Sequence, residues 1–145
     1  MRWRYVTVPV TIGVAAPLPA GAALMPEHAA SNDAYSLGLL LAEMGKHKEA
    51  LGYLERAAKG LPERSRIQYN LGLLLQVLQR DSEAEAALQK SLGLEPTNMD
   101  YLYALADFYI KRNRLSEAKK VAETMVAAHP DQRIGRELLD VIERR

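Results

Sequence analysis

The chain has 145 residues, of which 48% are hydrophobic and 26% are charged, a composition typical of one folded domain or a short repeat array. Its formal net charge is +1, and acidic and basic residues are equal in number from Ser31 onward, so the sequence offers neither a basic stripe for nucleic acid nor a polybasic membrane patch. The absence of cysteine excludes disulfides, thiolate metal sites and a cysteine nucleophile.

Residues 1–30 differ in composition from the rest of the chain. Arg2 and Arg4 precede a stretch from Tyr5 to Pro26 that carries no charge and contains a small-residue site, Ala20-Gly21-Ala22. A basic start, an apolar run and a small-residue site are typical of a secretory signal peptide. The stretch is long enough to cross a bilayer, but its prolines would break a spanning helix, so we expect no stable membrane span.

Three interpretations of this leader stay open at the level of sequence. It is a cleaved signal peptide, an extended leader, as the strand-like composition of Val6-Thr7-Val8 favours, or a sign that the chain was cut from a longer protein. The expected localisation follows from the choice. A signal peptide makes the protein periplasmic or secreted in a bacterium, and otherwise we expect it in the cytoplasm.

From Ser31 onward, apolar residues recur at steps of three and four, which is the period of an amphipathic helix. Short polar segments interrupt the pattern, for example Gly45-Lys46-His47 and Asn113-Arg114. The predicted helices lie near residues 32–44, 48–60, 65–78, 82–93, 99–112, 116–128 and 131–144.

Four sets of residues recur with a common step of 34. They are Pro62, Pro96 and Pro130; Ala50, Ala84 and Ala118; Leu37, Leu71 and Leu105; and Gly38, Gly72 and Ala106. A fixed period between 20 and 50 residues is the signature of supersecondary units that stack on one another. The small residues let two helices approach closely, and the leucines fill the space between units.

These columns resemble the tetratricopeptide repeat family, whose unit is a 34-residue helix–turn–helix. The family's second-helix alanine and closing proline are matched in all three units, and its Leu-Gly pair is matched in two units and, with a tolerated alanine, by Leu105-Ala106 in the third. Its large second-helix residue is Leu54 and Leu88 but Ala122 in the third unit. The resemblance implies an all-α, right-handed superhelix of three helix–turn–helix repeats with a C-terminal capping helix. The implied division is a leader at 1–30, repeats at 31–64, 65–98 and 99–132, and a capping helix at 131–145.

The resemblance also implies that the first helix of each pair lines a concave groove that binds a peptide. The candidate groove residues are Tyr35, Leu39, Arg66, Tyr69, Asn70, Leu73, Tyr103, Asp107 and Lys111. Tyr35, Tyr69 and Tyr103 keep the 34-residue step. We interpret them either as an aromatic strip that grips a partner or as side chains that pack against the neighbouring first helix. Tyr35, Leu39 and Leu73 replace the polar residues of the family's carboxylate clamp, so we do not expect that binding mode.

Residues that carry catalytic or metal chemistry do not cluster in this sequence. The three histidines have no metal-like spacing, and no phosphate loop, nucleophile elbow or HExxH motif occurs. We interpret the basic residues between Lys111 and Lys120 as a solvated face. We therefore predict no catalytic residue, no metal and no cofactor, and no binding of nucleic acid.

The function expected from the sequence is a non-enzymatic module that binds a protein or a peptide in its groove and assists assembly of a larger complex. The alternative is a structural module without a ligand of its own, which either dimerises through its open end or forms the terminal part of a larger protein. An oligomer is compatible with both interpretations.

Overall fold

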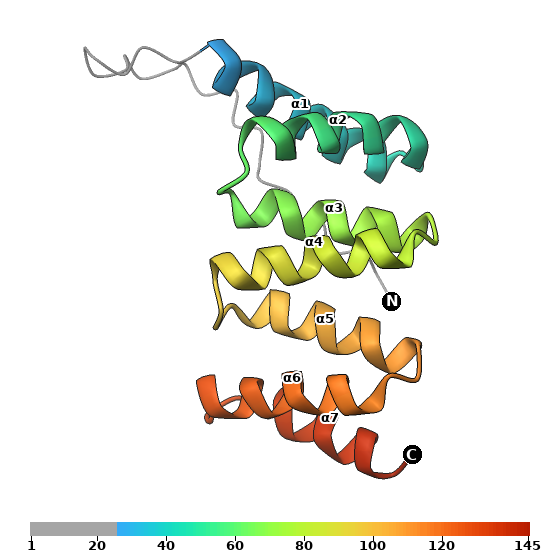
Figure 1. Cartoon of the computed structure of the whole chain (residues 1–145), viewed down its shortest axis with the longest axis vertical. Helices are drawn as coiled ribbons and strands as arrows, with labels where there is room; N and C mark the ends of the chain where they lie inside the picture. Colours follow the sequence, from blue (N-terminus) through green and yellow to red (C-terminus); the bar gives the residue numbers. More distant parts are fainter. Residues whose placement is uncertain (1–25) are drawn as a thin grey trace, which may run out of the picture.

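The computed structural model describes residues 26–145, which form a stack of α-helices (Figure 1). Residues 1–25, which hold most of the predicted leader and its signal-peptide features, lie outside the described residues. The helices are α1 (Pro26–Glu43), α2 (His47–Gly60), α3 (Ser65–Val77), α4 (Asp81–Leu94), α5 (Met99–Lys111), α6 (Leu115–Ala128) and α7 (Ile134–Glu143). The predicted all-α fold is confirmed, since residues 26–145 contain no strand.

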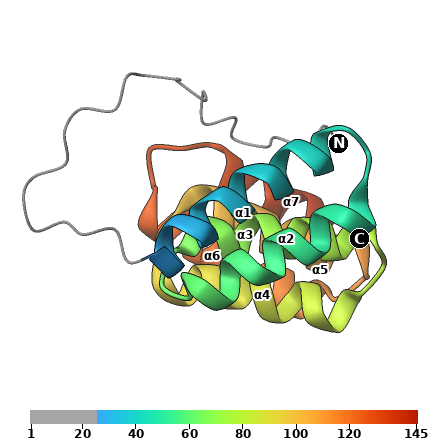
Figure 2. The same ribbon diagram turned by 90° about the horizontal axis from the view of Figure 1, so that it is seen from above.

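The helices pack as consecutive antiparallel pairs. α1 packs on α2, α3 on α4 and α5 on α6, and each first helix also contacts the second helix of the pair before it. α1 and α2 form one end of the stack, and α6 and α7 form the other end (Figure 1). Seen along the stack, the pairs lie one behind another (Figure 2).

Two helix starts differ from the prediction by more than one residue. α1 begins at Pro26, six residues earlier than expected and inside the segment assigned to the leader. Proline suits the first turn of a helix, where no backbone N–H is needed for an intrahelical bond. α7 begins at Ile134 and not at 131, because the chain turns after Pro130 and the N–H of Gln132 donates to the carbonyl of His129 at 3.1 Å.

The turn inside each helix pair contains a residue with positive φ. Gly45, Gln79 and Asn113 have φ of 78°, 59° and 57°, and they are spaced by the 34-residue period. The next N–H in each turn donates back to a carbonyl of the first helix, for example Arg80 to Leu75 at 2.9 Å. This is a Schellman-type helix end, in which a left-handed residue lets the last carbonyls find donors. Only the first of the three turns uses glycine, the residue that adopts this conformation without steric cost.

Close approach within the first two pairs depends on glycine. A Cβ atom at Gly38 would lie 2.9 Å from Cγ of Leu54, and one at Gly72 would lie 2.8 Å from Cγ of Leu88. The third pair has Ala106 and Ala122 at the equivalent positions, and both are fully buried. The two departures in the third pair therefore compensate each other. Ala122 is smaller than the leucine of the other pairs, and this leaves room for the methyl group that Ala106 has and glycine lacks.

α7 occupies the place of the first helix of a fourth unit. It packs on α6 as α5 packs on α4. Leu139 and Ile142 follow Leu105 and Phe108 by 34 residues, and Ile142 is buried in the same way as Phe108. The capping helix α7 thus packs on α6 in the same way as a first helix packs on the preceding helix pair, and it continues the repeat pattern.

Candidate functional site

The nine candidate groove residues all lie on first helices of the stack. Tyr35 and Leu39 are on α1, and Tyr103, Asp107 and Lys111 are on α5. The remaining four, Arg66, Tyr69, Asn70 and Leu73, are on α3. We call the outward side of α1, α3, α5 and α7 the first-helix surface. The structure brings these residues together on neighbouring helices, but it does not expose them equally.

Tyr35 and Asn70 are buried between α1 and α3. The Nδ2 of Asn70 donates to the hydroxyl of Tyr35 at 2.6 Å, while Oδ1 of Asn70 has no partner among the described residues. Burial raises the pKa of the Tyr35 hydroxyl. Tyr35 is only 9% exposed. Its arrangement agrees with the interpretation that it packs against the neighbouring first helix.

Tyr69 is held in the same way between α3 and α5. It is 8% exposed, and its ring lies 5.1 Å from the ring of Tyr101. The Arg66 guanidinium lies 5.1 Å from the centre of the Tyr69 ring and 5.0 Å from that of Tyr101, and it forms an ion pair with Asp100 at 3.3 Å. Burial also raises the pKa of Tyr69. Arg66 is therefore positioned by two aromatic faces and one carboxylate.

Tyr103 is the exposed member of the tyrosine column, the three tyrosines Tyr35, Tyr69 and Tyr103 that recur at 34-residue steps; 37% of its surface is exposed. Asp100 and Asp107 lie three residues before it and four after it, so the three side chains share one face of α5. Asp107 accepts an ion pair from Lys111 at 2.8 Å. This part of the first-helix surface presents an aromatic ring between two carboxylates, each of which has a cationic partner.

The remaining candidates and α7 complete this surface. Leu73 is buried and Leu39 is partly buried, so neither projects freely. Val141, which follows Asp107 by 34 residues, is exposed on α7. Val141 is not among the residues predicted from the sequence, although the 34-residue step from Asp107 indicates it. At the repeat positions of the candidate groove residues, the exposed apolar side chains are therefore Tyr103 on α5 and Val141 on α7, because Tyr35 and Tyr69 are buried.

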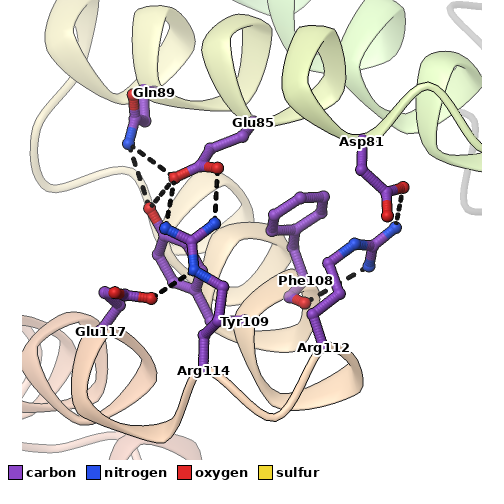
Figure 3. A network of polar contacts seen from close by, with 8 residues as sticks. All are labelled: Asp81, Glu85, Gln89, Phe108, Tyr109, Arg112, Arg114 and Glu117. Carbon is purple, nitrogen blue, oxygen red and sulfur yellow. Dashed lines mark hydrogen bonds and ion pairs between the residues drawn. The ribbon is translucent and has the colours of Figure 1, made fainter.

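A polar network joins the second and third helix pairs (Figure 3). Arg114 binds Glu85 through two hydrogen bonds of 2.6 and 3.0 Å and also contacts Glu117, while the Tyr109 hydroxyl donates to Glu85 at 3.0 Å. Hydrogen bonding from Arg114 lowers the pKa of Glu85. Arg112 departs from the predicted solvated face, because it binds Asp81, lies 3.8 Å from the centre of the Phe108 ring and has a side chain that is only 21% exposed. Arg114 is paired as well, but its side chain stays 40% exposed.

The described residues do not assemble an ion site. Within residues 26–145, no group of three or more histidine, aspartate or glutamate side chains is arranged to hold a metal. His129 instead contacts the backbone oxygen of Thr97 through Nε2, at 2.5 Å. None of the helices in this part of the chain has the length and apolar character needed to cross a membrane.

Comparison with protein families identifies two matching models. Both are described as tetratricopeptide repeat, and they match residues 35–98 and 82–139. Together they cover most of the helical stack and reach into α7. No curated protein matches the sequence at a significant level.

Solved structures share the fold at low sequence identity. One is the first repeat domain of Spaghetti (RPAP3) bound to the HSP90 peptide SRMEEVD, with 17% identity, a TM-score of 0.71 and coverage of 81% of this chain and 93% of that chain. A second is the Yersinia enterocolitica chaperone SycD in complex with a peptide of the translocator YopD, with 15% identity, a TM-score of 0.69 and coverage of 77% and 91%. A third is MamA from Desulfovibrio magneticus RS-1, with 24% identity, a TM-score of 0.68 and coverage of 77% and 63%.

Proposed function

Because the chain belongs to the tetratricopeptide repeat family, we propose that it is a non-enzymatic module that binds a protein or peptide partner on its first-helix surface. The observation that carries the proposal is the exposure of Tyr103 and Val141 on neighbouring first helices, next to paired charges. Two structures with the same fold were solved with bound peptides, which supports this class of function.

The chemistry of the surface defines the partner. A tyrosine ring offers apolar area and a hydroxyl at little cost in side-chain entropy, which is why tyrosine recurs at the centre of interfaces. Asp100 and Asp107 already have cationic partners, so the local charge is balanced. We expect a peptide or a partner helix that places an apolar side chain against Tyr103 and polar groups on either side of it.

Peptide selection tests this proposal without a known partner. Peptides would be selected from a random displayed library on the full chain, and their affinity for the Tyr103→Ala variant would be measured by calorimetry. We expect a loss of roughly thirtyfold or more, the effect of removing a central aromatic contact. Tyr53→Ala is the matched control, because Tyr53 is a partly exposed tyrosine on α2 and lies outside the first-helix surface. Equal affinity of both variants would refute the proposal.

We also propose a role and a cellular location for the protein. A rigid stack that binds one partner could assist the assembly of a larger complex. The protein is periplasmic or secreted if residues 1–30 act as a signal peptide, and cytoplasmic otherwise. Mass spectrometry of the expressed protein tests this point, because processing would remove about 22 residues from the N-terminus. Recovery of the full-length mass from the cell envelope fraction would contradict cleavage.

A further inference from the structure

Arg66 and Asp100 occupy the same repeat position on neighbouring first helices, since they are 34 residues apart. Arg66 lies in the first turn of α3 and Asp100 in the first turn of α5, so their ion pair of 3.3 Å joins the two helices at the end where both begin. Tyr103 follows Asp100 by three residues, which makes the two side chains neighbours on one face of α5. A partner that contacts Tyr103 therefore has this ion pair within reach.

The guanidinium of Arg66 is held in place but has hydrogen-bond donors to spare. Its Cζ lies 5.1 and 5.0 Å from the centres of the Tyr69 and Tyr101 rings, and these contacts orient the side chain without using an acceptor. A guanidinium has five N–H donors. Among residues 26–145, Arg66 donates one hydrogen bond, from Nη1 to Oδ2 of Asp100. None of its nitrogens is both buried and unpaired, so the unused donors stay accessible to solvent.

The carboxylate of Asp100 keeps acceptor capacity in the same way. Its side chain is 58% exposed, against 29% for that of Arg66. A carboxylate has about four lone-pair sites, and the described part of the chain fills one of them, through Arg66. The pair thus presents several N–H donors beside an acceptor, and its net charge is zero.

This combination disfavours a charged ligand. An acidic side chain that bound Arg66 would be repelled by Asp100, and a basic side chain that bound Asp100 would be repelled by Arg66. A carboxamide avoids both penalties, because its carbonyl oxygen accepts from Arg66 while its NH₂ group donates to Asp100. Arg66 is recessed between two helices, so a side chain reaches it more readily than a main chain does.

We propose that Arg66 and Asp100 form a subsite for an asparagine or glutamine side chain of the partner, beside the apolar residue that contacts Tyr103. This inference rests on the partner binding proposed above and adds one chemical requirement to it. The Cβ atoms of helical residues three apart are about 5–6 Å from each other. That separation is close to the span of two residues in an extended peptide or of three to four in a helix. The carboxamide and the apolar residue of the partner should therefore be two to four residues apart.

Peptides selected on the full chain from a random displayed library test the subsite. We expect those that lose affinity for Tyr103→Ala to carry Asn or Gln two to four residues from an apolar residue. Replacing this Asn by Leu, or this Gln by Met, should weaken binding to the unmodified chain roughly tenfold or more, because hydrogen bonds to charged groups are lost. Peptides that depend on Tyr103 but carry a charged residue in this place, or tolerate loss of every polar side chain, would overturn the inference and leave the partner-binding proposal standing. Selection of no peptide that depends on Tyr103 would overturn both.

Arg66→Met tests whether the ion pair makes this contact. Methionine keeps an apolar stem against the two rings but has no N–H donor. The variant should bind the selected peptide roughly tenfold or more weakly, and removal of the peptide carboxamide should then cost little further affinity. Arg56→Met is the matched control, since Arg56 also lies against a tyrosine ring, that of Tyr53 at 5.4 Å, but on α2.

Thermal melting followed by circular dichroism verifies that both arginine variants fold. If Arg66→Met does not fold, the peptide substitutions on the unmodified chain still decide the outcome. A carboxamide that contributes equally to binding with and without Arg66 would refute the subsite, because its hydrogen bonds would then be made elsewhere.

Discussion

Replacement of Gly72 by alanine tests the close helix approach that sets the repeat. A Cβ at this position would lie 2.8 Å from Cγ and 3.2 Å from the backbone N of Leu88, which is itself fully buried. The side chain of Leu88 has no solvent to move into, so the helices must separate. Overpacking of this kind costs about 1–3 kcal/mol.

Gly52 provides the matched control for this experiment. It also lies inside a helix, but a Cβ there would meet nothing within 4 Å. Alanine in place of glycine in a helix interior contributes about 1 kcal/mol through backbone entropy at both positions. Gly52→Ala should therefore stabilise the protein by about 1 kcal/mol, and Gly72→Ala should be less stable than Gly52→Ala by about 1–3 kcal/mol.

Urea unfolding followed by circular dichroism measures both free energies of unfolding. The difference between the two variants isolates the steric cost, because the gain in helix propensity is common to both. The same difference should lower the melting temperature of Gly72→Ala relative to Gly52→Ala by roughly 2–12 °C. Equal stabilisation of the two variants would refute the reasoning, since it would mean that Leu88 yields without cost.

Three further predictions concern single contacts in the stack. Tyr35→Phe should lower the free energy of unfolding by about 1–3 kcal/mol, because the buried Asn70 amide loses its acceptor; an unchanged value in urea unfolding would contradict this. Gln79→Gly should raise the melting temperature, since glycine adopts φ of 59° without strain; a lower melting temperature would count against it. Arg114 lowers the pKa of Glu85, so this contact adds stability above the pKa of an unfolded glutamate, near 4.3, and that stability is lost as the pH falls through the lower folded value. Glu85→Gln should therefore reduce the loss of stability between about pH 5 and pH 3, as measured by urea unfolding at each pH; an equal loss in both proteins would contradict this.

Most of the fold could be predicted from the residues that recur at 34-residue steps. Gly38, Gly72 and the alanines at 50, 84 and 118 recur because each unit meets the same neighbour, and one period therefore locates many contacts at once. The start of α1 at Pro26 was missed, because the first unit has no earlier copy to compare with and its helix extends beyond the repeat.

The candidate site could be predicted from the sequence less completely than the fold. The tyrosine column is periodic, but exposure is not, since each tyrosine meets a different neighbour: Asn70 at Tyr35, Tyr101 at Tyr69 and solvent at Tyr103. The network around Glu85 and Arg114 was also missed. Its central pair, Glu85 and Arg114, is 29 residues apart, and the residue one unit before Glu85 is Leu51, so no period indicates this contact. The contact of Arg114 with Glu117 does recur, as Arg80 with Glu83.

The central claim is that a partner binds the first-helix surface at α5 and α7. Backbone-amide NMR of the full chain with a selected peptide tests it most directly. We predict that the largest chemical-shift changes on titration occur at amides around Tyr103 and Val141, with little change on α2 and α4. Changes concentrated on α1, α2 or α4, with α5 and α7 unaffected, would contradict the claim.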